Sequence, residues 1–562
     1  MATKFRLLTE LCDRLGGTTK RTIMVEYAAE FLESLQPEEV EPAVSMLLGR
    51  PFPRWDQRVL EVSWTTLSGI IKRLTNIDWK DFREAFSQTG DIGDATRIVF
   101  ENSKIRKQST LFEKPLTILE VRRTFEQIAE ASGFGSRERK ERLLETLLSQ
   151  AAPVEAKYLI KILTGDMRTG FHEGLMELTV AKAFDIPLGT VQTATMLTGD
   201  IEEVAAVARG KGREGVEKLQ FHVFHPIKPM MAKMAADVNE ALQEAEGCEL
   251  AFEFKLDGVR LQIHKSDGHV RIFSRRLTDV TESLPEVVQL VKNEVRANEA
   301  ILDGEVIAVG AKKSPLLFQH VMRRFRRVHG IDEITKQIPL ELQVFDIIFL
   351  DGQSLIHQPY TERRKKLAEV AGHISLTTQL ITEDKAEAEQ FLKTALNQGH
   401  EGLVAKKTDS PYTPGVRGKR WFKIKSTLQS LDLVIVAAEW GYGRRHNWLS
   451  DYYLAARDAE TGKYVIVGKT FKGLTDKEII DMTERLKNLI MEEEPHRVVV
   501  TPSIVVEVAY NEIQKSPKYE CGMALRFARI TRIRDDKTPE EADTIQTARE
   551  IYEKQYEKKA RL

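Results

Sequence analysis

The spacing of apolar residues changes its period once along this chain of 562 residues. Up to about residue 220, segments such as EAKYLIKILTG place apolar side chains, including Leu159, Ile162 and Leu163, at helical spacing. From about residue 250, apolar residues such as Leu261 and Ile263 alternate with polar ones, as in a half-buried strand. The sequence therefore predicts a helical part followed by parts that contain sheets.

Local signals divide the second part further. Ser266, Asp267 and Gly268 predict a hairpin turn between two alternating segments. The runs ILDGEVIAV and LQVFDIIFLDG predict strands, and TERRKKLAEV and KAEAEQFLKTAL predict helices packed between them. After LDLVIVAAEW, several short strands separated by polar turns predict a small barrel, followed by a charged helix from about Pro539.

The length of the chain and a segment with two prolines set the expected number and bounds of the domains. At roughly 150 residues per domain, the chain has room for three or four. The segment PIKPMMAKM at 226–234 contains two prolines and predicts a linker. We expect a multidomain α+β protein with an all-helical domain at 1–225, a mixed α/β domain at 226–425 and a β-barrel domain at 426–562.

The net charge of the whole chain argues against a nucleic-acid partner, but the local distribution of cations does not. Lys and Arg number 83 against 84 Asp and Glu, a formal net charge of -1. The cations are clustered locally, however, at two places: Arg417, Lys419, Arg420, Lys423 and Lys425, and then Arg526, Arg529, Arg532, Arg534 and Lys537. A polyanion site therefore has to come from these clusters.

The three cysteines, Cys12, Cys248 and Cys521, are too scattered for a Cys-x-x-Cys metal site or a disulfide framework. The chain has no run of 18 apolar residues, and its first 15 residues have the pattern of an amphipathic helix. We expect a cytoplasmic protein with reduced thiols that does not enter a membrane.

Lys255 follows an apolar strand and directly precedes a turn signal at Asp257 and Gly258. A lysine in such a strand-turn-strand segment is usually a solvated surface charge. Here other segments follow in a characteristic order, and they are centred on Arg275 (FSRRLTDVTESLPEV), Glu305 (ILDGEVIAV), Phe345 (LQVFDIIFLDG), Glu401 (EGLVAKK), Lys423 and Lys425 (KRWFKIK), and Arg526 to Lys537 (ALRFARITRIRDDK).

This ordered set resembles the motifs of the covalent nucleotidyltransferases, which comprise DNA ligases, RNA ligases and messenger-RNA capping enzymes. The helical part, with LIKILTGDMRTGFHEG, resembles the DNA-binding domain of ATP-dependent DNA ligases, and the length is similar to that of archaeal members. The resemblance implies a DNA-binding domain, an adenylation domain and an OB-fold domain in that order. It also implies a monomer that seals nicks in duplex DNA during replication, repair and recombination. Arg168 and Lys161 are candidate phosphate contacts in the helical part.

The resemblance makes Lys255 the nucleophile that attacks the α-phosphate of ATP, forming lysine-AMP and releasing pyrophosphate. Only a neutral amine can attack, so the pKa of Lys255 must be lowered by partial burial and by nearby cations. Arg260, Arg275 and Lys425 are candidates for these cations. Developing phosphoryl charge also needs cations already in place, for which Lys423 and Lys425 are suitable.

Further site residues follow from the resemblance alone. Glu253 would hold the adenine, Phe345 would stack on it, and Glu305 would bond the ribose hydroxyls. Arg275 and Arg420 would contact the phosphate and ribose. Magnesium, or manganese in its place, would use Glu401 first, with Glu305 and Asp257 as further candidate ligands.

The C-terminal cluster resembles the family's terminal motif. Arg526, Arg529, Arg534, Asp536 and Lys537 would lie on a mobile domain that closes over ATP and later clasps DNA. A second short segment, KQSTLFEKP, resembles a sliding-clamp binding peptide, with Gln108, Leu111 and Phe112 as its anchors. The alternative for that segment is an ordinary loop.

Three other functions remain open at this point. An RNA ligase or capping enzyme shares the lysine motif, although capping enzymes lack the large helical domain. An NAD-dependent ligase would carry a cysteine-rich zinc element, which three scattered cysteines cannot build. A noncatalytic DNA-binding or clamp-adaptor protein would have no need of Lys255, Glu305, Glu401, Lys423 and Lys425 together.

Overall fold

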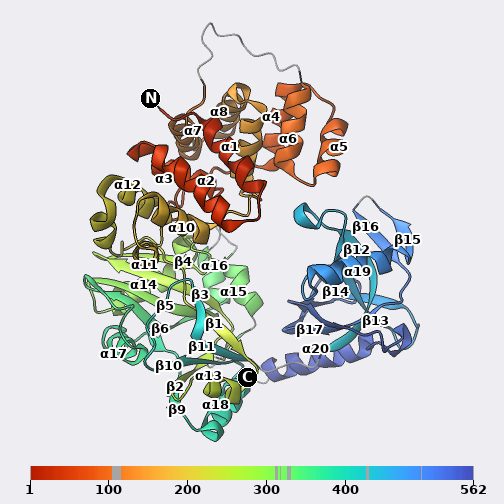
Figure 1. Ribbon diagram of the computed structural model, residues 1–562. Helices are drawn as coiled ribbons and strands as arrows, with labels where there is room; N and C mark the ends of the chain where they lie inside the picture. Colours follow the sequence, from red (N-terminus) through yellow and green to blue (C-terminus); the bar gives the residue numbers. More distant parts are fainter. Residues whose placement is uncertain are drawn as a thin grey trace. The chain divides into compact units, whose positions relative to one another are not determined.

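The computed structural model describes residues 2–103, 115–310, 314–316, 318–325, 331–425, 430–494 and 496–560 (Figure 1). The chain divides into two compact units. The first contains 1–309, 318–389 and 404–423, and the second contains 310–317, 390–403 and 424–562. Of the helices in the described ranges, none combines the length and apolar character that crossing a membrane requires.

The described residues up to 217 are mainly helical, which confirms the prediction for this part. The helices are α1 (Phe5–Gly16), α2 (Arg21–Ser34), α3 (Pro37–Leu47), α4 (Trp64–Thr75), α5 (Trp79–Thr89), α6 (Ile92–Asn102), α7 (Ile118–Glu130), α8 (Ser136–Gln150), α9 (Pro153–Thr164), α10 (Glu173–Ala183), α11 (Leu188–Thr198) and α12 (Ile201–Glu217). Leu159 and Ile162 of α9 are buried, as their spacing predicts, and Gly165 ends this helix with a φ of 69°.

Lys161, although it is charged, belongs to this helical core. Its ammonium donates to Asp91 at 2.6 Å and to the carbonyl of Met167 at 3.2 Å. The side chain is buried, so Lys161 is not a surface phosphate contact and that expectation was wrong. Arg168 is more exposed, and it bonds Asp166 and the carbonyl of Gly90.

Two sheets form the central part of the first unit. The five-stranded sheet has the order β1-β11-β10-β2-β9, and the six-stranded sheet has the order β4-β3-β5-β6-β7, with β8 parallel to β6. Their strands are β1 (Met231–Ala235), β2 (Leu250–Lys255), β3 (Val259–Ser266), β4 (His269–Ser274), β5 (Glu299–Ala308), β6 (Leu340–Leu350), β7 (Gln353–Ser354), β8 (Ser375–Leu376), β9 (Gln379–Thr382), β10 (Gly402–Lys407) and β11 (Arg417–Lys425). The predicted hairpin is β3–β4, and its turn residues Asp267 and Gly268 both have positive φ.

Helices accompany the strands of this central region. They are α13 (Val238–Glu244), α14 (Pro285–Glu294), α15 (Phe318–Phe325), α16 (Ile331–Gln337), α17 (Tyr360–Val370) and α18 (Lys385–Asn397). The last two match predicted helices. The predicted linker at 226–234 is in part a strand, because β1 begins at Met231, whose N–H donates to the carbonyl of Val416 at 3.0 Å. Pro229 precedes the strand and β1 lies at the sheet edge, so the proline costs no ladder hydrogen bond.

The second unit is rich in antiparallel strands, as predicted. They are β12 (Leu431–Trp440), β13 (Leu449–Arg457), β14 (Tyr464–Thr470), β15 (Ile490–Glu493), β16 (Arg497–Val500), β17 (Val505–Ala509), β18 (Glu512–Lys515), β19 (Met523–Arg526) and β20 (Arg529–Ile533). The long strand β12 pairs with β13, β16 and β17, and β17 pairs with β20. Within the described part of this unit the pairs do not close into a ring, so the predicted barrel is an open, curled sheet.

Two helices complete the second unit. The sequence analysis did not anticipate α19 (Asp476–Lys487), which packs on β13 and begins with a capping box between Thr475 and Glu478. The terminal helix α20 (Ile545–Ala560) begins later than the predicted Pro539. The delay has a structural reason, since the N–H of Asp543 donates to the carbonyl of Asp432 on β12 before the helix starts.

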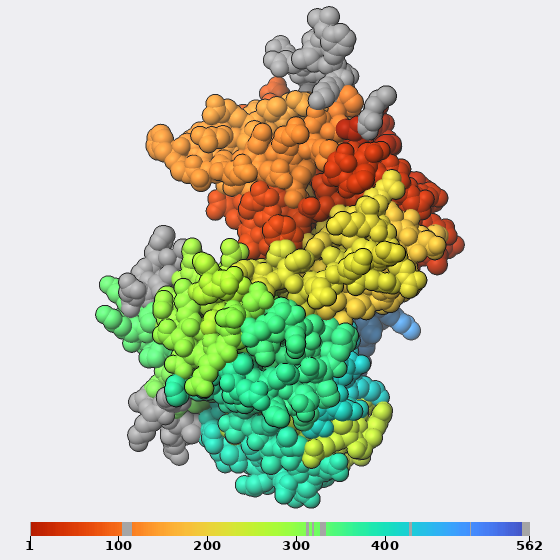
Figure 2. Space-filling view, turned by 90° about the vertical axis from the view of Figure 1, so that its left-hand side faces the viewer, coloured from red at the N-terminus to blue at the C-terminus, as the bar shows by residue number. Residues whose placement is uncertain are grey.

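Within the first unit, the end of the helical part packs against the central sheets. Phe221 meets Phe349 edge to face, with ring centroids 5.9 Å apart. Ile227 and Ile301 belong to the same buried cluster. Figure 2 shows the yellow end of the helical part against the green surface of the central region. The end of the helical part therefore packs into a buried cluster of the central region, which is separate from the core of the helices themselves.

Candidate active site

Lys255 is the last residue of β2, and β3 begins four residues later at Val259. Gly258 is required between them by close approach, because a Cβ at this position would lie 2.3 Å from the carbonyl oxygen of Val306 on β5. The N–H of Gly258 donates to Glu305 at 3.1 Å. The turn after Lys255 is thus held against β5, and the Glu305 carboxylate lies at that turn.

Glu253 lies two residues before Lys255 and is almost fully buried. One of its oxygens accepts hydrogen bonds from the hydroxyl of Tyr360 and, at 3.2 Å, from the amide of Gln379. The other lies 2.7 Å from the ammonium of Lys406. A buried carboxylate needs such partners, and these three fix the orientation of Glu253.

Lys406, on β10, was not singled out by the sequence analysis. Its ammonium lies 4.6 Å from the ring centroid of Phe345, 4.7 Å from that of Tyr360 and 4.4 Å from that of Trp421. It also donates to the carbonyl of Phe345 at 3.3 Å. Burial lowers the pKa of Lys406, while Glu253 acts in the opposite direction.

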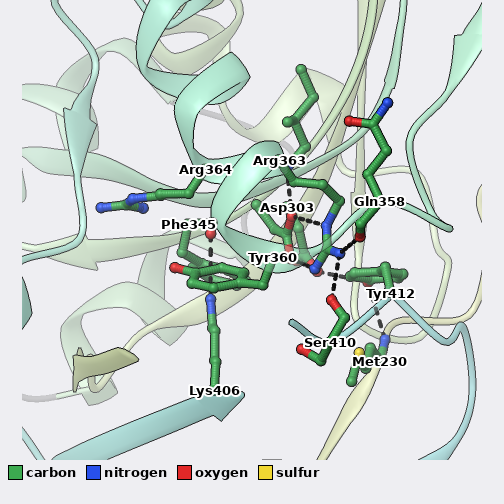
Figure 3. A network of polar contacts seen from close by, with 12 residues as sticks. Met230, Asp303, Phe345, Gln358, Tyr360, Arg363, Arg364, Lys406, Ser410 and Tyr412 are labelled. Atoms are coloured by element: carbon green, nitrogen blue, oxygen red, sulfur yellow. Dashed lines mark hydrogen bonds and ion pairs between the residues drawn. The ribbon is translucent and has the colours of Figure 1, made fainter. Parts of the chain in front are cut away.

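Phe345, the expected adenine-stacking residue, is 9% exposed on β6. It meets Trp421 edge to face at 6.5 Å between ring centroids. Figure 3 shows the side chains of Lys406 and Tyr360 close to it. The structure therefore brings together two predicted adenine contacts, Glu253 and Phe345, through Lys406.

Arg260, predicted as a cation near Lys255, is paired with a carboxylate on the neighbouring strand. Its guanidinium forms a two-pronged ion pair with Asp303, at 2.9 and 2.5 Å, and donates to the carbonyl of Met230 at 2.7 Å. Asp303 also accepts from the hydroxyl of Tyr412 at 2.8 Å. Because Asp303 balances its charge, Arg260 has less positive charge to offer Lys255 than predicted.

A second buried Arg–Asp pair supports the same region. Arg363 on α17 bonds both oxygens of Asp346, at 2.8 and 2.9 Å, and neither side chain reaches solvent. Its guanidinium also donates to the carbonyls of Gln358 and Ser410, towards which it points in Figure 3. This pair fastens α17, which carries Tyr360, to strand β6.

The predicted phosphate-binding cations lie on two elements of the first unit. Arg275 follows β4, and partial burial together with Arg260 and Arg417 lowers the pKa of its guanidinium. Arg420 and Lys423 are half-buried residues of β11. As expected for a strand, the neighbours Phe422 and Ile424 are buried while Lys423 and Lys425 are not.

The remaining predicted residues belong to the second unit or lie outside the described residues. Glu401 and Lys425 form an ion pair at 2.7 Å. Nowhere in the described ranges do three or more His, Cys, Asp or Glu side chains gather in a way that could hold a metal ion. The clamp-peptide candidates Gln108, Leu111 and Phe112 lie outside the described residues.

The C-terminal motif gathers around Asp432 of β12. Arg534 lies 3.0 Å and Lys537 2.6 Å from one oxygen of this carboxylate, and Arg534 also bonds Asp536 at 2.8 Å. Arg526 pairs with Glu512 at 2.8 Å, and Arg529 is exposed on β20. The sequence analysis did not foresee Asp432 as the centre of this cluster.

Three family models match the chain in order. The DNA ligase N terminus matches residues 4–181, the ATP dependent DNA ligase domain matches 229–425, and the ATP dependent DNA ligase C terminal region matches 445–537. The middle match contains Lys255 and the buried network around Glu253.

Curated relatives match over almost the whole length. The DNA ligase of Thermococcus onnurineus is 44% identical, with 99% of each chain covered. DNA ligase 1 of Korarchaeum cryptofilum is 47% identical, with 98% of each chain covered. A solved structure named Pmar-Lig_Pre covers 94% of this chain and 99% of its own, with a TM-score of 0.57 and 17% identity, which supports the fold alone. The chain belongs to the family of ATP-dependent DNA ligases.

Proposed function

We propose that this protein seals nicks in duplex DNA with Lys255 as its nucleophile. The observation that carries this proposal is the position of Lys255 at the end of β2. Immediately after it, Gly258 is pressed against β5 and bonded to Glu305. A side chain at the mouth of a sheet, beside a fixed carboxylate, can meet a nucleotide bound there.

In the first step the neutral Nζ atom of Lys255 attacks the α-phosphorus of ATP. A bond from nitrogen to phosphorus forms, the bond to the pyrophosphate oxygen breaks, and the amine loses a proton. Pyrophosphate leaves and lysine-AMP remains. Arg275, Arg420 and Lys423 are the cations that we assign to the nucleotide phosphate and ribose region, because preplaced positive charge stabilises the phosphoryl group in transfer.

The adenine is assigned to the pocket around Glu253 and Phe345. An apolar aromatic face suits stacking, and a carboxylate accepts hydrogen bonds from an amino group. Lys406, Tyr360 and Gln379 hold Glu253 in one orientation before the nucleotide binds. This preorganisation reduces the entropy that nucleotide binding has to overcome.

In the later steps AMP passes from Lys255 to the 5′-phosphate of a nicked strand. The adjacent 3′-hydroxyl then attacks that phosphate, AMP leaves, and the backbone is joined. The helical part and the cations of the C-terminal motif are assigned to the DNA, where contacts to phosphates are independent of sequence and sensitive to salt. Replication, repair and recombination are the processes that need this reaction.

Magnesium is proposed as the metal, with manganese as a substitute. It would neutralise phosphate oxygens, and it requires only one or two carboxylates because it keeps several waters. Glu305 is suitable because it lies at the turn after Lys255. Glu401 is the second candidate, and on binding the metal it would give up its ion pair with Lys425.

Several finer assignments are also part of the proposal. We assign domain boundaries near residues 225 and 425, a monomeric and cytoplasmic protein, and an OB-type fold for the C-terminal region. We also assign clamp docking to residues 108–112. Replacement of Phe112 by Ala should weaken binding to the sliding clamp, and an unchanged affinity would remove this last assignment.

The test of the proposed function is a two-stage experiment. Protein is first incubated with α-labelled ATP and magnesium without DNA, and it should acquire label covalently. It is then separated from ATP and mixed with nicked DNA or nicked RNA. The label should leave the protein and the nick should close on DNA only. Sealing of RNA instead would favour an RNA ligase, and a wild-type protein without label would refute the catalytic proposal.

A further inference from the structure

Residues 50–58, between α3 and α4 of the helical part, contact the central region, and we name this segment the strap. Arg50 and Arg54 of the strap lie 3.1 and 2.7 Å from the carboxylate of Glu173, the first residue of α10. Lys228, at the start of the central region, pairs with the same carboxylate. Glu173 therefore joins the strap and the central region at one partly buried point.

An aromatic contact provides a second attachment. The Trp55 ring stacks on that of His225, with centroids 4.7 Å apart and planes 3° from parallel. Burial, followed by the nearby His222 and Arg271, lowers the pKa of His225 to about 4. The stacked imidazole is therefore neutral near pH 7, and the contact is independent of charge in that range.

The third attachment uses both ends of the Gln57 amide. Its nitrogen donates to the carbonyl of Leu277 at 3.1 Å, and its oxygen accepts from the N–H of Asp279 at 2.9 Å. The Leu277 carbonyl and the Asp279 N–H lie at the end of a tight turn at 274–278. The turn is closed by a hydrogen bond from the N–H of Ser274 to the carbonyl of Thr278 and by one from the N–H of Leu277 to the carbonyl of Ser274. Gln57 thus pairs with this turn as a neighbouring strand would.

The turn that Gln57 holds is strained. Leu277 has a φ of 65°, a left-handed conformation that a leucine rarely adopts without external support. Its side chain is buried, so the turn cannot relax by moving Leu277 into solvent without losing apolar contacts. The two hydrogen bonds from Gln57 stabilise this conformation from outside the central sheets.

The same turn carries Arg275, one of the cations assigned to the nucleotide. Its guanidinium is exposed, and its nearest polar contact in the described residues is the thioether of Met231 at 3.6 Å. Partial desolvation, together with Arg260 and Arg417, lowers the pKa of its guanidinium and Glu305 raises it, so Arg275 lies among charged groups of both signs. The direction of Arg275 depends on the backbone of the turn.

We propose that Gln57 is a positioning residue for nucleotidyl transfer, acting through the turn that carries Arg275. This inference rests on the proposed function, in which Arg275 contacts the nucleotide. It adds a structural link by which the helical part, through the strap, controls the geometry of the adenylation site. A change in the strap is then transmitted to Arg275 through the two hydrogen bonds between the Gln57 amide and the backbone of Leu277 and Asp279.

The experiment compares Gln57→Met, which keeps the size of the side chain, with Gln57→Glu, which keeps only the acceptor. The rate of label transfer from α-labelled ATP to the protein is measured without DNA, across ATP concentrations. Gln57→Met should lower the maximal rate about 10-fold to 100-fold through misplacement of Arg275. Gln57→Glu should lower it at least as much, because its carboxylate faces the carbonyl of Leu277. Gln192→Ala, which removes an amide bonded within the helical part, is the control and should keep the wild-type rate.

A double-mutant cycle separates positioning from a general structural effect. In the Arg275→Ala background, Gln57→Met should cause little further loss, since both changes act through one group. An equal loss in both backgrounds, or a wild-type rate for Gln57→Met alone, would overturn the inference. The unfolding temperature of each variant shows whether a lower rate of label transfer comes from misfolding. If Gln57→Met misfolds, the rate of Gln57→Glu is used to test the inference in its place. Failure of the wild-type protein to take up label would count against the proposed function instead.

Discussion

Ion pairs in the central region and in the C-terminal motif use the same kinds of side chain, but their cations differ in burial. Around Glu253 and Asp346, the cations Lys406 and Arg363 are almost fully buried. Around Asp432, Arg534 and Lys537 are partly exposed, with 18% and 31% of their side chains open to solvent. In both places a nearly buried carboxylate gathers two or more donors, but only in the first set are the cations buried as well.

This difference determines what each cluster can do. A buried pair cannot separate without leaving an uncompensated charge, so it fixes geometry. An exposed pair is worth little and is exchanged readily for another partner, including a phosphate. The central network is therefore suited to holding a pocket, and the C-terminal cluster is suited to exchanging Asp432 for a polyanion.

The largest effect on stability is expected from Lys406→Met. The change leaves the Glu253 carboxylate buried without its cation, and it should lower the free energy of unfolding by about 3–5 kcal/mol. Denaturant unfolding of the purified protein measures this loss. The double change Lys406→Met and Glu253→Gln should recover part of it, because no unpaired charge remains. No recovery in the double variant would mean that the packing of Lys406, rather than its charge, is what matters.

A smaller loss is expected from Arg363→Lys. A lysine cannot bond both oxygens of Asp346 and also reach the carbonyls of Gln358 and Ser410, so at least one buried acceptor is left without a donor. The free energy of unfolding should fall by about 1–3 kcal/mol. Arg444→Lys, at an exposed ion pair, provides the matched control. Equal losses in the two variants would contradict the contrast between buried and exposed pairs.

Asp200 differs from the carboxylates above because it is a buried carboxyl group that keeps its proton. Burial and the neighbouring Glu202 raise its pKa to about 9, so the folded protein holds a proton there that the unfolded chain releases above about pH 4. The stability from this proton is complete below about pH 4 and is lost as the pH rises towards 9, with a slope of at most about 1.4 kcal/mol per pH unit. Asp200→Asn should flatten this part of the pH profile of unfolding. A profile identical to that of the wild type would show that Asp200 does not titrate there.

The smallest effect is expected from Lys537→Met. The Lys537 side chain is partly exposed, and Arg534 remains bonded to Asp432, so the free energy of unfolding should change little. Any change should shrink further in 1 M salt, where exposed charges are screened. A large loss that persists at high salt would place this cluster in the same class as the central network.

The strand-turn-strand at Lys255 could be predicted because its signals are local. The apolar run, the Asp257–Gly258 turn and the following alternation lie next to one another in the sequence, and β2 ends at Lys255 as expected. The buried faces of β11 follow from the same alternation. Gly258 shows the limit of this reasoning, since its contact with Val306 requires the pairing of β3 with β5.

Partners from distant segments could not be predicted in this way. A lysine within a strand, such as Lys406, is usually solvated, and only the tertiary packing surrounds it with aromatic rings. Gln57 lies in a segment without a recognisable motif, and Asp432 lies in an apolar run. Helix α19 did have a local signal, because Thr475 and Glu478 form the Thr-x-x-Glu pattern of a capping box.

The most direct test of this account is to locate the adenylyl group on the protein. Lys255 is near Glu253 in the sequence and Lys406 is near it in space. The structure gives the two lysines different surroundings: Lys406 is paired with Glu253, whereas Lys255 ends a strand at the turn bonded to Glu305. Protein labelled with ATP is digested, and the modified peptide is identified by mass spectrometry. We predict that AMP is attached to Lys255 and that Lys255→Ala is unlabelled. Attachment to Lys406 or to any other lysine would contradict the account.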